Sequence, residues 1–319
     1  MNKIPLIIDT DPGIDDILAI ILAAASDKYE IKALTATHGN VGLMGTSQNA
    51  LHIADMLKLD CIVAKGAEKP LIVPQKDASH IHGANGAAGY EFPKTNRKCC
   101  DEPAWDVMYK LAKESEGELV LAVLGPMTNV AIALLKYPDL PQYIKRIYMM
   151  GGSRSFGNHS QNAEFNIWGD PHACEIVLQS GVAITMADLI FGNDHPLTGD
   201  MVRAAYDGAK RLKPMLDAFW QHDMQWVKKD GEKQGKAIDP ATYGFSIYDA
   251  TAVAAMLLQE ELKTEDYYVL CETQGSETQG QTVFDYKGQK GKAPNVQLAV
   301  KMPIDKYYKL FAQAMAHFE

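Results

Sequence analysis

The sequence lacks features that would mark several classes of protein. Its longest apolar stretch without a charge, residues 17–25, is far shorter than the roughly 20 residues of a membrane-spanning helix. It has no excess of basic residues, because 31 lysines and arginines stand against 40 aspartates and glutamates, giving a net charge of −9. Such a chain lacks the positive footprint that binds duplex nucleic acid or anionic membranes. We therefore expect neither as a partner.

Cysteine is also scarce, and its pattern bears on location. The 319 residues contain five cysteines, of which Cys99 and Cys100 are adjacent. The first residues carry an acidic side chain at Asp9, so we expect no signal peptide. An odd number of cysteines without secretory marks indicates free thiols in a reducing compartment. We expect a cytoplasmic protein.

What the sequence does contain is a regular alternation of two kinds of segment over its first two thirds. Short aliphatic or β-branched runs lie at 4–9, 31–38, 61–64, 119–124, 144–150 and 182–187. Segments of helical length lie between them, at 14–26, 46–57, 104–115, 126–136 and 171–180. Near-continuous apolar strands that alternate with helices predict an α/β fold, a Rossmann-like, mostly parallel sheet with helices on both faces.

The last third changes character. Residues 197–230 and 249–259 have helical patterns, short strands are predicted at 267–272, 281–286 and 296–301, and a final helix begins at Pro303. We expect extra C-terminal helices and short antiparallel strands here. Two segments, 74–103 and 228–243, are rich in glycine and polar or charged residues, which is typical of lid loops. We predict a single domain over residues 1–319.

The most informative segment is 9–16, which reads Asp-Thr-Asp-Pro-Gly-Ile-Asp-Asp and follows the first apolar run. Acidic residues in the first turn of a helix gain only about 0.3–1 kcal/mol each from the helix dipole. Two like charges about 4 Å apart repel by roughly 4 kcal/mol at an effective dielectric near 20. Capping of a turn and a helix explains one of these aspartates but not four. The cluster therefore holds protons at raised pKa or binds a hard cation.

This segment resembles the signature of the calcium-dependent nucleoside hydrolases, the inosine–uridine nucleoside N-ribohydrolases. Further blocks resemble motifs of that family in the same order: Thr-His-Gly-Asn at 37–40, His-Ile-His-Gly at 80–83, Leu-Gly-Pro-Met-Thr-Asn at 124–129, Met-Met-Gly-Gly at 149–152, and Ala-Glu-Phe-Asn at 163–166 followed by Asp-Pro at 170–171. The resemblance covers roughly residues 4–300. It implies an enzyme that hydrolyses the N-glycosidic bond of ribonucleosides to ribose and free base in nucleoside salvage, as a homodimer or homotetramer.

The family pattern also implies a metal site. Ca²⁺ would be held by Asp11, Asp16, the backbone carbonyl of Leu124 and Asp249. Asp11 would in addition act as the general base that takes a proton from the metal-activated water. Asp249 has a simpler interpretation as well, because a carboxylate at the start of an apolar helix can be a cap.

The same pattern implies a ribose site. Asp15 would bind the 2′-hydroxyl side of the sugar, and Asp9 would support the cluster. The other residues implied to bind the substrate are Asn40, Met150, Asn158, Glu164 and Asn166. Taken singly, each asparagine is more typical of a turn, and Met150 is equally typical of a core.

The sequence departs from the family at the leaving group. In the best-known members a histidine precedes the late aspartate, whereas here Tyr248 does. A phenol with pKa near 10 is a weaker acid than imidazolium at neutral pH. His82, in the first of the two lid loops, is the other candidate for assisting base departure. Aromatic residues that could stack on the base are Phe156, Trp168, Phe219, Trp220, Trp226 and Tyr243.

Two other functions remain open at this point. Because Tyr248 replaces the histidine, the chain could be a catalytically weak protein that binds nucleoside or ribose. A phosphohydrolase with Asp9 as nucleophile is the third hypothesis, and it would need Mg²⁺ and a phosphorylated substrate.

Overall fold

The computed structural model describes residues 3–318, and its centre is an eight-stranded sheet. The strands lie in the order β3-β2-β1-β4-β5-β6-β12-β9, and of the described pairs in this sheet only β12 with β9 is antiparallel. Their bounds are Ile4–Thr10 (β1), Tyr29–Ala36 (β2), Ile62–Lys65 (β3), Leu119–Val123 (β4), Ile144–Met150 (β5), Ile184–Ala187 (β6), Val296–Lys301 (β12) and Lys263–Tyr267 (β9). The predicted α/β fold with a mostly parallel sheet is confirmed.

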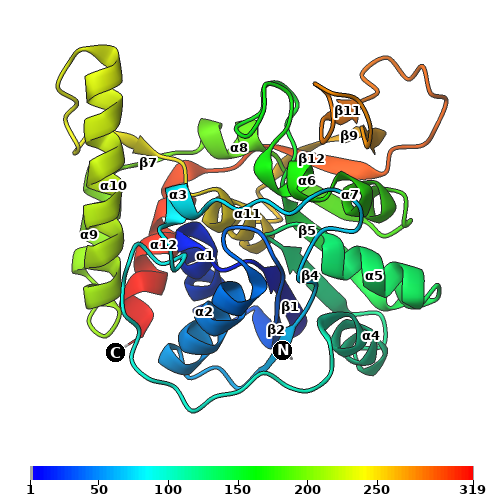
Figure 1. The fold of residues 1–319 in the computed structure, drawn as a ribbon, viewed down its shortest axis with the longest axis horizontal. Helices are drawn as coiled ribbons and strands as arrows, with labels where there is room; N and C mark the ends of the chain where they lie inside the picture. The colour runs from blue at the N-terminus through cyan, green and yellow to red at the C-terminus, as the bar shows by residue number, and fades with distance from the viewer. Residues whose placement is uncertain (1–2, 319) are drawn as a thin grey trace.

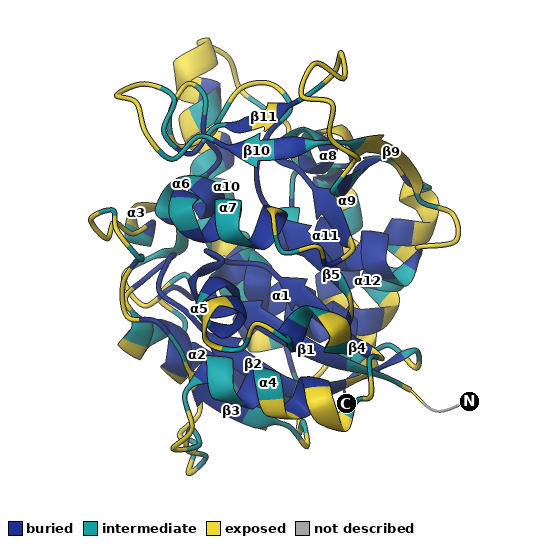
Figure 2. Cartoon of the chain, turned by 90° about the vertical axis from the view of Figure 1, so that its right-hand side faces the viewer, coloured by how far each residue is buried: buried dark blue, intermediate teal, exposed yellow. Residues whose placement is uncertain are grey.

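The central strands are buried on both faces, as Figure 2 shows by their uniform dark blue. In β1, Leu6 and Ile8 pack into one hydrophobic core and Ile7, between them, packs into the other. Successive side chains of a strand point to opposite faces of the sheet. A strand covered by helices on both faces therefore reads as an unbroken apolar run, which explains the pattern in the sequence.

Helices form a layer on each side of this sheet (Figure 1). One face is covered by Ile14–Ala24 (α1), Leu43–Met56 (α2), Tyr248–Leu257 (α11) and Ile304–His317 (α12), and the other by Ala104–Glu114 (α4), Thr128–Lys136 (α5) and Pro171–Leu178 (α7). Helix α1 packs directly against α11. The remaining helices are Ser79–His82 (α3), Leu140–Tyr143 (η1), Phe165–Gly169 (α6), Leu189–Asp194 (α8), Gly199–Asp207 (α9) and Lys213–Gln234 (α10).

The order of the strands places a crevice at one point of the sheet. Strand β1 pairs with β2 on one side and with β4 on the other, so the connections that leave β1 and β4 diverge. Ligands in doubly wound α/β folds bind at such a switch point, outside the carboxyl ends of the strands. The acidic segment 9–16 and the turn 124–129 both lie there.

The structure corrects the prediction of one long helical segment followed by a lid loop from residue 228. Residues 197–230 form the two-residue strand Leu197–Thr198 (β7), which pairs with Gly244–Phe245 (β8), then α9 and most of α10. Helix α10 continues to Gln234, so only 235–243 is a loop. The charged residues near its end are good helix formers, and the helix stops where Gly235 takes a left-handed φ of 65°.

Smaller differences occur elsewhere. The strand predicted at 267–272 is divided, because β9 ends at Tyr267 and the next strand, Val269–Cys271 (β10), pairs with Thr282–Phe284 (β11) in a separate hairpin. The segment 74–103 contains the short helix α3 and otherwise no regular element. Helices α6 and α8 are too short to show a period in the sequence.

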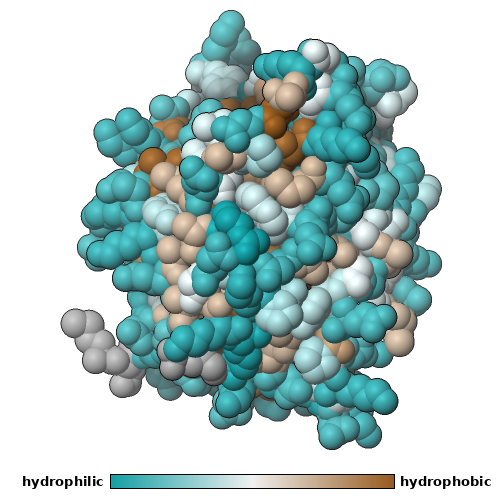
Figure 3. All heavy atoms as spheres, turned by 90° about the vertical axis from the view of Figure 1, so that its left-hand side faces the viewer, coloured by the Kyte–Doolittle hydropathy of each residue, from teal (hydrophilic) through white to brown (hydrophobic). Residues whose placement is uncertain are grey.

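The surface agrees with the composition. Figure 3, which views the side where Figure 1 shows α9 and α10, is mostly hydrophilic, with hydrophobic atoms gathered in its upper part. Among residues 3–318, none of the helices combines the length and the apolar character that crossing a bilayer requires.

Candidate active site

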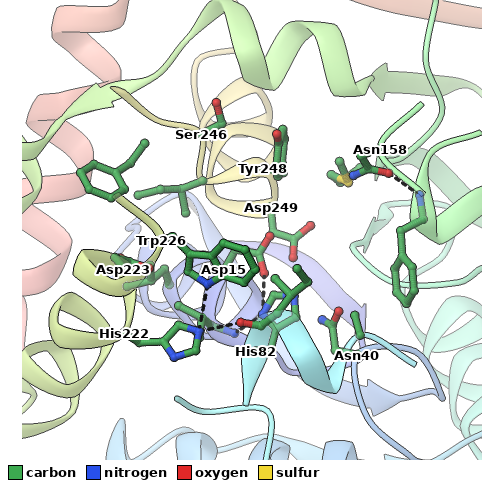
Figure 4. A pocket seen from close by; sticks show the side chains of 18 of the residues that line it. Asp15, Asn40, His82, Asn158, His222, Asp223, Trp226, Ser246, Tyr248 and Asp249 are labelled. Atoms are coloured by element: carbon green, nitrogen blue, oxygen red, sulfur yellow. Dashed lines mark hydrogen bonds and ion pairs between the residues drawn. The ribbon is translucent and has the colours of Figure 1, made fainter. Parts of the chain in front are cut away.

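A pocket of about 600 Å³ opens at the carboxyl ends of β1, β4 and β5. Its walls come from the loops that follow these strands, from α3, from α9 and α10, and from the segment 243–249 that enters α11. Figure 4 shows Asp15, His82 and Asp249 near its middle, with Asp223 and Trp226 toward one side and Asn158 toward the other. The pocket therefore joins segments that are far apart in the sequence.

Asp16 holds the loop between β1 and α1 in place. Its buried carboxylate accepts hydrogen bonds from the Thr10 hydroxyl, from the backbone N–H groups of Asp11 (3.2 Å) and Gly13 (2.9 Å), and from Asn40 Nδ2 (2.9 Å). The predicted ligand Asp16 is thus fixed by the start of its own helix and by the turn after β2.

Asp11 is packed between two glycine turns. Its Oδ2 accepts the backbone N–H of Asn40 at 2.7 Å, and its Oδ1 is buried with no hydrogen-bond partner among the described residues. A Cβ at Gly39 would lie 1.9 Å from Oδ2, and one at Gly125 would lie 2.2 Å from Oδ1. Only glycine fits at either turn. Burial, followed by the charge of Asp16, raises the pKa of Asp11 well above its ordinary value.

Three carboxylates form a group that could hold a metal ion. Ligand oxygens of Asp15, Asp16 and Asp249 lie within 4.8 Å of one another. Burial and their mutual charge raise the pKa of Asp16 to about 6 and that of Asp249 well above its ordinary value, and burial alone raises that of Asp15 to about 6. Asp15 Oδ1, like Asp11 Oδ1, is buried without a described partner. Orphaned carboxylate oxygens gathered in this way fit a hard cation with oxygen ligands.

This group differs in one member from the predicted ligand set. Asp15, predicted to bind ribose, lies among the three carboxylates, whereas Asp11 lies beside them and adds its charge to Asp249. Leu124 lines the pocket, and its carbonyl accepts a hydrogen bond from Asn166 Nδ2 at 2.6 Å.

The residues predicted to bind substrate come together in the pocket. Glu164 is buried at the start of α6, where it accepts the backbone N–H groups of Gly152 (3.0 Å), Asn166 (2.9 Å) and Ile167 (3.3 Å). Burial raises its pKa to about 7. Asn158 Oδ1 accepts the N–H of Phe165 at 2.9 Å (Figure 4). The pocket is lined by all six predicted substrate residues: Asp15, Asn40, Met150, Asn158, Glu164 and Asn166.

Neither candidate for assisting base departure is a strong acid in this setting. His82 Nδ1 accepts the N–H of Ile14 at 3.2 Å and lies 3.8 Å from Asp15 Oδ1. Burial lowers the pKa of His82 to about 4, so its ring is neutral at pH 7 with its proton on Nε2. The Tyr248 hydroxyl donates to Asn193 Oδ1 at 2.9 Å, and burial raises its pKa above the ordinary value.

On the helix opposite the acidic segment, sequence reasoning proposed Trp226 and missed the polar residues beside it. His222, Asp223, Trp226 and Asp230 of α10 line the pocket, at a spacing that places them on one face of the helix. His222 Nε2 donates to the carbonyl of Ile81 at 2.6 Å, which ties α10 to α3. The signal available in the sequence was this helical spacing of polar and aromatic residues within a segment predicted to be helical.

Of the six aromatic residues proposed as stacking partners, two line the pocket and four do not. Trp226 and Tyr243 line the pocket, and the Tyr243 hydroxyl donates to Asp230 Oδ2 at 2.6 Å. Of the other four, Phe219 is in the core, Phe156 is exposed, and Trp168 and Trp220 lie outside the lining. Tyr206 and Phe245, which sequence reasoning did not propose, line the pocket as well.

Asp9 is not placed to act as a nucleophile, so the phosphohydrolase hypothesis is wrong. Its side chain is fully buried under the site, where it accepts the Thr35 hydroxyl at 2.6 Å and Asn129 Nδ2 at 2.8 Å. Burial raises its pKa to about 7. Asp9 joins β1, β2 and the turn after β4 beneath the pocket.

The chain matches the family model described as inosine-uridine preferring nucleoside hydrolase over residues 6–309. The chain belongs to this family. Such enzymes are hydrolases of N-glycosyl bonds, so the chain is an enzyme of that class. The resemblance drawn from the six sequence blocks is confirmed.

Curated relatives and solved structures agree with the family. The chain is 34% identical over 314 residues to proteins named non-specific ribonucleoside hydrolase RihC from Escherichia coli O1:K1 and Shigella flexneri, covering 98% of this chain and 99% of theirs. Its fold is similar to a plant nucleoside hydrolase (TM-score 0.88, 26% identity, 99% of each chain). It is also similar to a purine-preferring ribonucleoside hydrolase from Gardnerella vaginalis (TM-score 0.87, 29% identity, 98% of each chain).

Proposed function

We propose that this nucleoside hydrolase cleaves the N-glycosidic bond of ribonucleosides with water, releases ribose and the free base, and serves nucleoside salvage. The observation that carries the proposal is the cluster of carboxylates at the switch point, of which Asp11 and Asp15 each have a buried oxygen without a hydrogen-bond partner among the described residues, set beside buried polar groups that suit a sugar. The RihC relatives, which are named for hydrolysing ribonucleosides, support it.

The acidic end of the pocket suits a ribose. Asn40, Glu164 and Asn166 are buried polar residues whose side chains are held by named hydrogen bonds, and Asp15 faces the pocket beside them. Fixed donors and acceptors of this kind orient a ligand at low entropic cost. Met150 completes this end with an apolar surface.

The metal implied by the family fits this end. Asp16 and Asp249, with Asp11, the Leu124 carbonyl and the neighbouring Asp15, would hold Ca²⁺, whose oxygen-ligand chemistry matches this donor set. When bound, such a cation acidifies water and polarises sugar hydroxyls. Asp11, whose Oδ1 has no described partner, is the general base that takes the proton of the attacking water.

The charge of the lining defines the substrate class. Five carboxylates line the pocket, and no lysine or arginine does among the residues that the structure describes. A phosphate group would meet these carboxylates without a cationic side chain to bind it. The substrate is therefore a nucleoside and not a nucleotide. The alternative of a weak nucleoside-binding protein is not favoured, because the relatives are named hydrolases and the pocket has a group of carboxylates that could hold a metal ion.

The test is the release of reducing sugar from inosine, adenosine, guanosine, uridine and cytidine, each with added Ca²⁺ and with excess chelator. Inosine 5′-monophosphate is the matched control. We expect ribose from at least one nucleoside, its loss on chelation, and none from the nucleotide. Folded protein with Ca²⁺ that releases ribose from none of the five contradicts the proposal. The cytoplasmic location and a homodimeric or homotetrameric state stay predictions.

A further inference from the structure

The wall of the pocket on α10 faces the base, which is the leaving group of the reaction. If the acidic end holds ribose, the base extends toward α10, where Trp226 and Phe245 form an apolar and aromatic surface together with Leu18 of α1. The inference below rests on the proposed function, because it assigns a role within that reaction.

One carboxylate on this wall has no partner. Of the five acids that line the pocket, Asp15 and Asp249 belong to the carboxylate group, Glu164 accepts three backbone N–H groups, and Asp230 accepts the Tyr243 hydroxyl. The fifth, Asp223, receives no hydrogen bond from any residue between 3 and 318, although it is partly buried. Figure 4 shows it on the α10 side of Asp15.

A second polar group on the same wall is also unpartnered. The hydroxyl of Tyr206, in α9, is fully buried without a hydrogen-bond partner among the described residues, and it lies within range of the charge on Asp223. A buried polar group left unpaired costs free energy that a bound ligand can recover. The Tyr206 hydroxyl is the buried unpaired group on this wall, and Asp223, which is only partly buried, is the unpartnered acid that a base in the pocket can reach.

Asp223 also has the proton affinity that neither earlier candidate has. Burial, with a smaller contribution from the charge of Asp15, raises the pKa of Asp223 to about 7. His82 is neutral at that pH, and the Tyr248 phenol holds its proton far more tightly. Proton transfer in catalysis is most efficient when the pKa of the donor lies near the working pH.

We propose that the carboxylic acid of Asp223 donates a proton to a ring nitrogen of the base as the base leaves the ribose. The bond between C1′ and the base nitrogen breaks, and its electron pair passes to the base. The Asp223 O–H bond breaks at the same time, so the base leaves neutral and Asp223 becomes a carboxylate. Water adds to C1′ and loses its proton to Asp11. Proton exchange with solvent then returns Asp223 to the carboxylic acid and Asp11 to the carboxylate.

The protonation of Asp223 makes the reaction depend on pH. A base that must be protonated is released more slowly as pH rises through about 7, because the carboxylic acid is then lost. Titratable groups that face it across the pocket, or flank it on its own helix, are Asp15, Tyr206, Tyr243, Tyr248, Asp249, His222 and Asp230. Substitution of Asp223 alone separates its effect from theirs.

The experiment compares two substrates in the Ca²⁺-loaded enzyme. Inosine needs a proton on its departing base, whereas the nitrophenolate of 4-nitrophenyl β-D-ribofuranoside departs without one. For Asp223→Asn we expect kcat/KM for inosine to fall by about 10²–10⁴. Its kcat/KM for the nitrophenyl riboside should stay near that of wild type. Asp223→Glu, which keeps a carboxylic acid, should restore part of the inosine activity. Glu232→Gln, which removes an exposed charge from the same helix, should change neither rate.

The outcomes distinguish this inference from the proposed function. Equal losses on both substrates in Asp223→Asn overturn the proton donation and leave a structural role, and no loss on either overturns it as well. If wild type cleaves neither substrate, the proposed function fails, and the inference fails with it. Cleavage of both substrates by wild type with no difference between them in Asp223→Asn overturns the inference alone.

Discussion

The two ends of the pocket are built in different ways. The acidic end is a short stretch of chain after β1, fixed by Asp16 and completed by buried groups from the turns after β2 and β4. The wall on α10 is a helix that reaches the site from elsewhere in the fold, and its link to α3 is the bond from His222 to Ile81. The first end is a cluster of hydrogen-bonded carboxylates in which Asp11 Oδ1 and Asp15 Oδ1 have no hydrogen-bond partner among the described residues, whereas the second combines aromatic side chains with the acids Asp223 and Asp230. We infer that the first end performs the part of the reaction common to all nucleosides, and the second selects and releases the base.

This contrast explains what the sequence could predict. Strands such as Leu119–Val123 are buried at every position, so their apolar runs are visible without any tertiary information. The acidic cluster was visible because its four carboxylates lie within eight residues. Their charge repulsion demanded a cation or protons before any fold was known.

The α10 wall could not be predicted in the same way. Whether Asp223 is a solvated surface residue or a pocket acid depends on segments such as α1 and α9, which line the same pocket only in the folded chain. The charges at 228–234 suggested a loop, although they continue a helix. The role of Asp15 was also open, because its position next to Asp249 arises from the packing of α1 against α11.

The largest expected effect is at the acidic end. Asp11→Asn removes the general base, so kcat/KM should fall by about 10²–10⁴ for every nucleoside alike. In the cation-free protein the free energy of unfolding should change little, because burial raises the pKa of Asp11 and the amide oxygen can still accept the Asn40 N–H. Steady-state kinetics and thermal melting check this, with the exposed Asp27→Asn as control. A loss confined to one base would break the division between the two ends.

The next effect concerns pH in the cation-free protein. The pKa values of Asp9 (about 7), Asp15 and Asp16 (about 6) are raised in the folded state above the ordinary 3.8. The folded state therefore binds more protons than the unfolded state between about pH 4 and 7, and stability falls as pH rises through that range. Thermal melts with chelator at pH 5 and pH 8 should show the lower melting temperature at pH 8.

Added cation should reverse that loss. At a concentration about 100 times its dissociation constant, Ca²⁺ stabilises the folded state by about 2.7 kcal/mol if it binds only that state. The gain should be larger at pH 8 than at pH 5, because the ligands must be deprotonated. If the melting temperature at pH 8 is the same with chelator as with Ca²⁺, there is no cation site at this end.

A smaller effect is expected for Asn166→Ala. The substitution removes the 2.6 Å hydrogen bond from Nδ2 to the Leu124 carbonyl and leaves a buried acceptor unpaired, a cost of about 1–3 kcal/mol. Both the free energy of unfolding and kcat/KM should fall, with similar factors for purine and pyrimidine nucleosides. Denaturant unfolding and kinetics on inosine and uridine measure these, and unequal factors would place Asn166 at the base end.

The smallest expected effect concerns the base end of the pocket. Trp226→Leu should change the ratio of kcat/KM between inosine and uridine by about tenfold, because a stacking surface differs in value for large and small bases. The cation-dependent shift in melting temperature should stay as in wild type. Trp220→Leu, outside the pocket lining, is the matched control. A Trp226 variant that loses the cation response would show that the ends are not separate.

The most direct test compares one variant from each end of the pocket on two substrates. In Ca²⁺-loaded protein, kcat/KM is measured for Asp11→Asn and Asp223→Asn on inosine and on 4-nitrophenyl β-D-ribofuranoside. We predict that Asp11→Asn loses activity on both substrates, whereas Asp223→Asn loses it on inosine alone. The same pattern of loss in both variants would contradict the division of the site into an end that activates water and holds ribose and an end that releases the base.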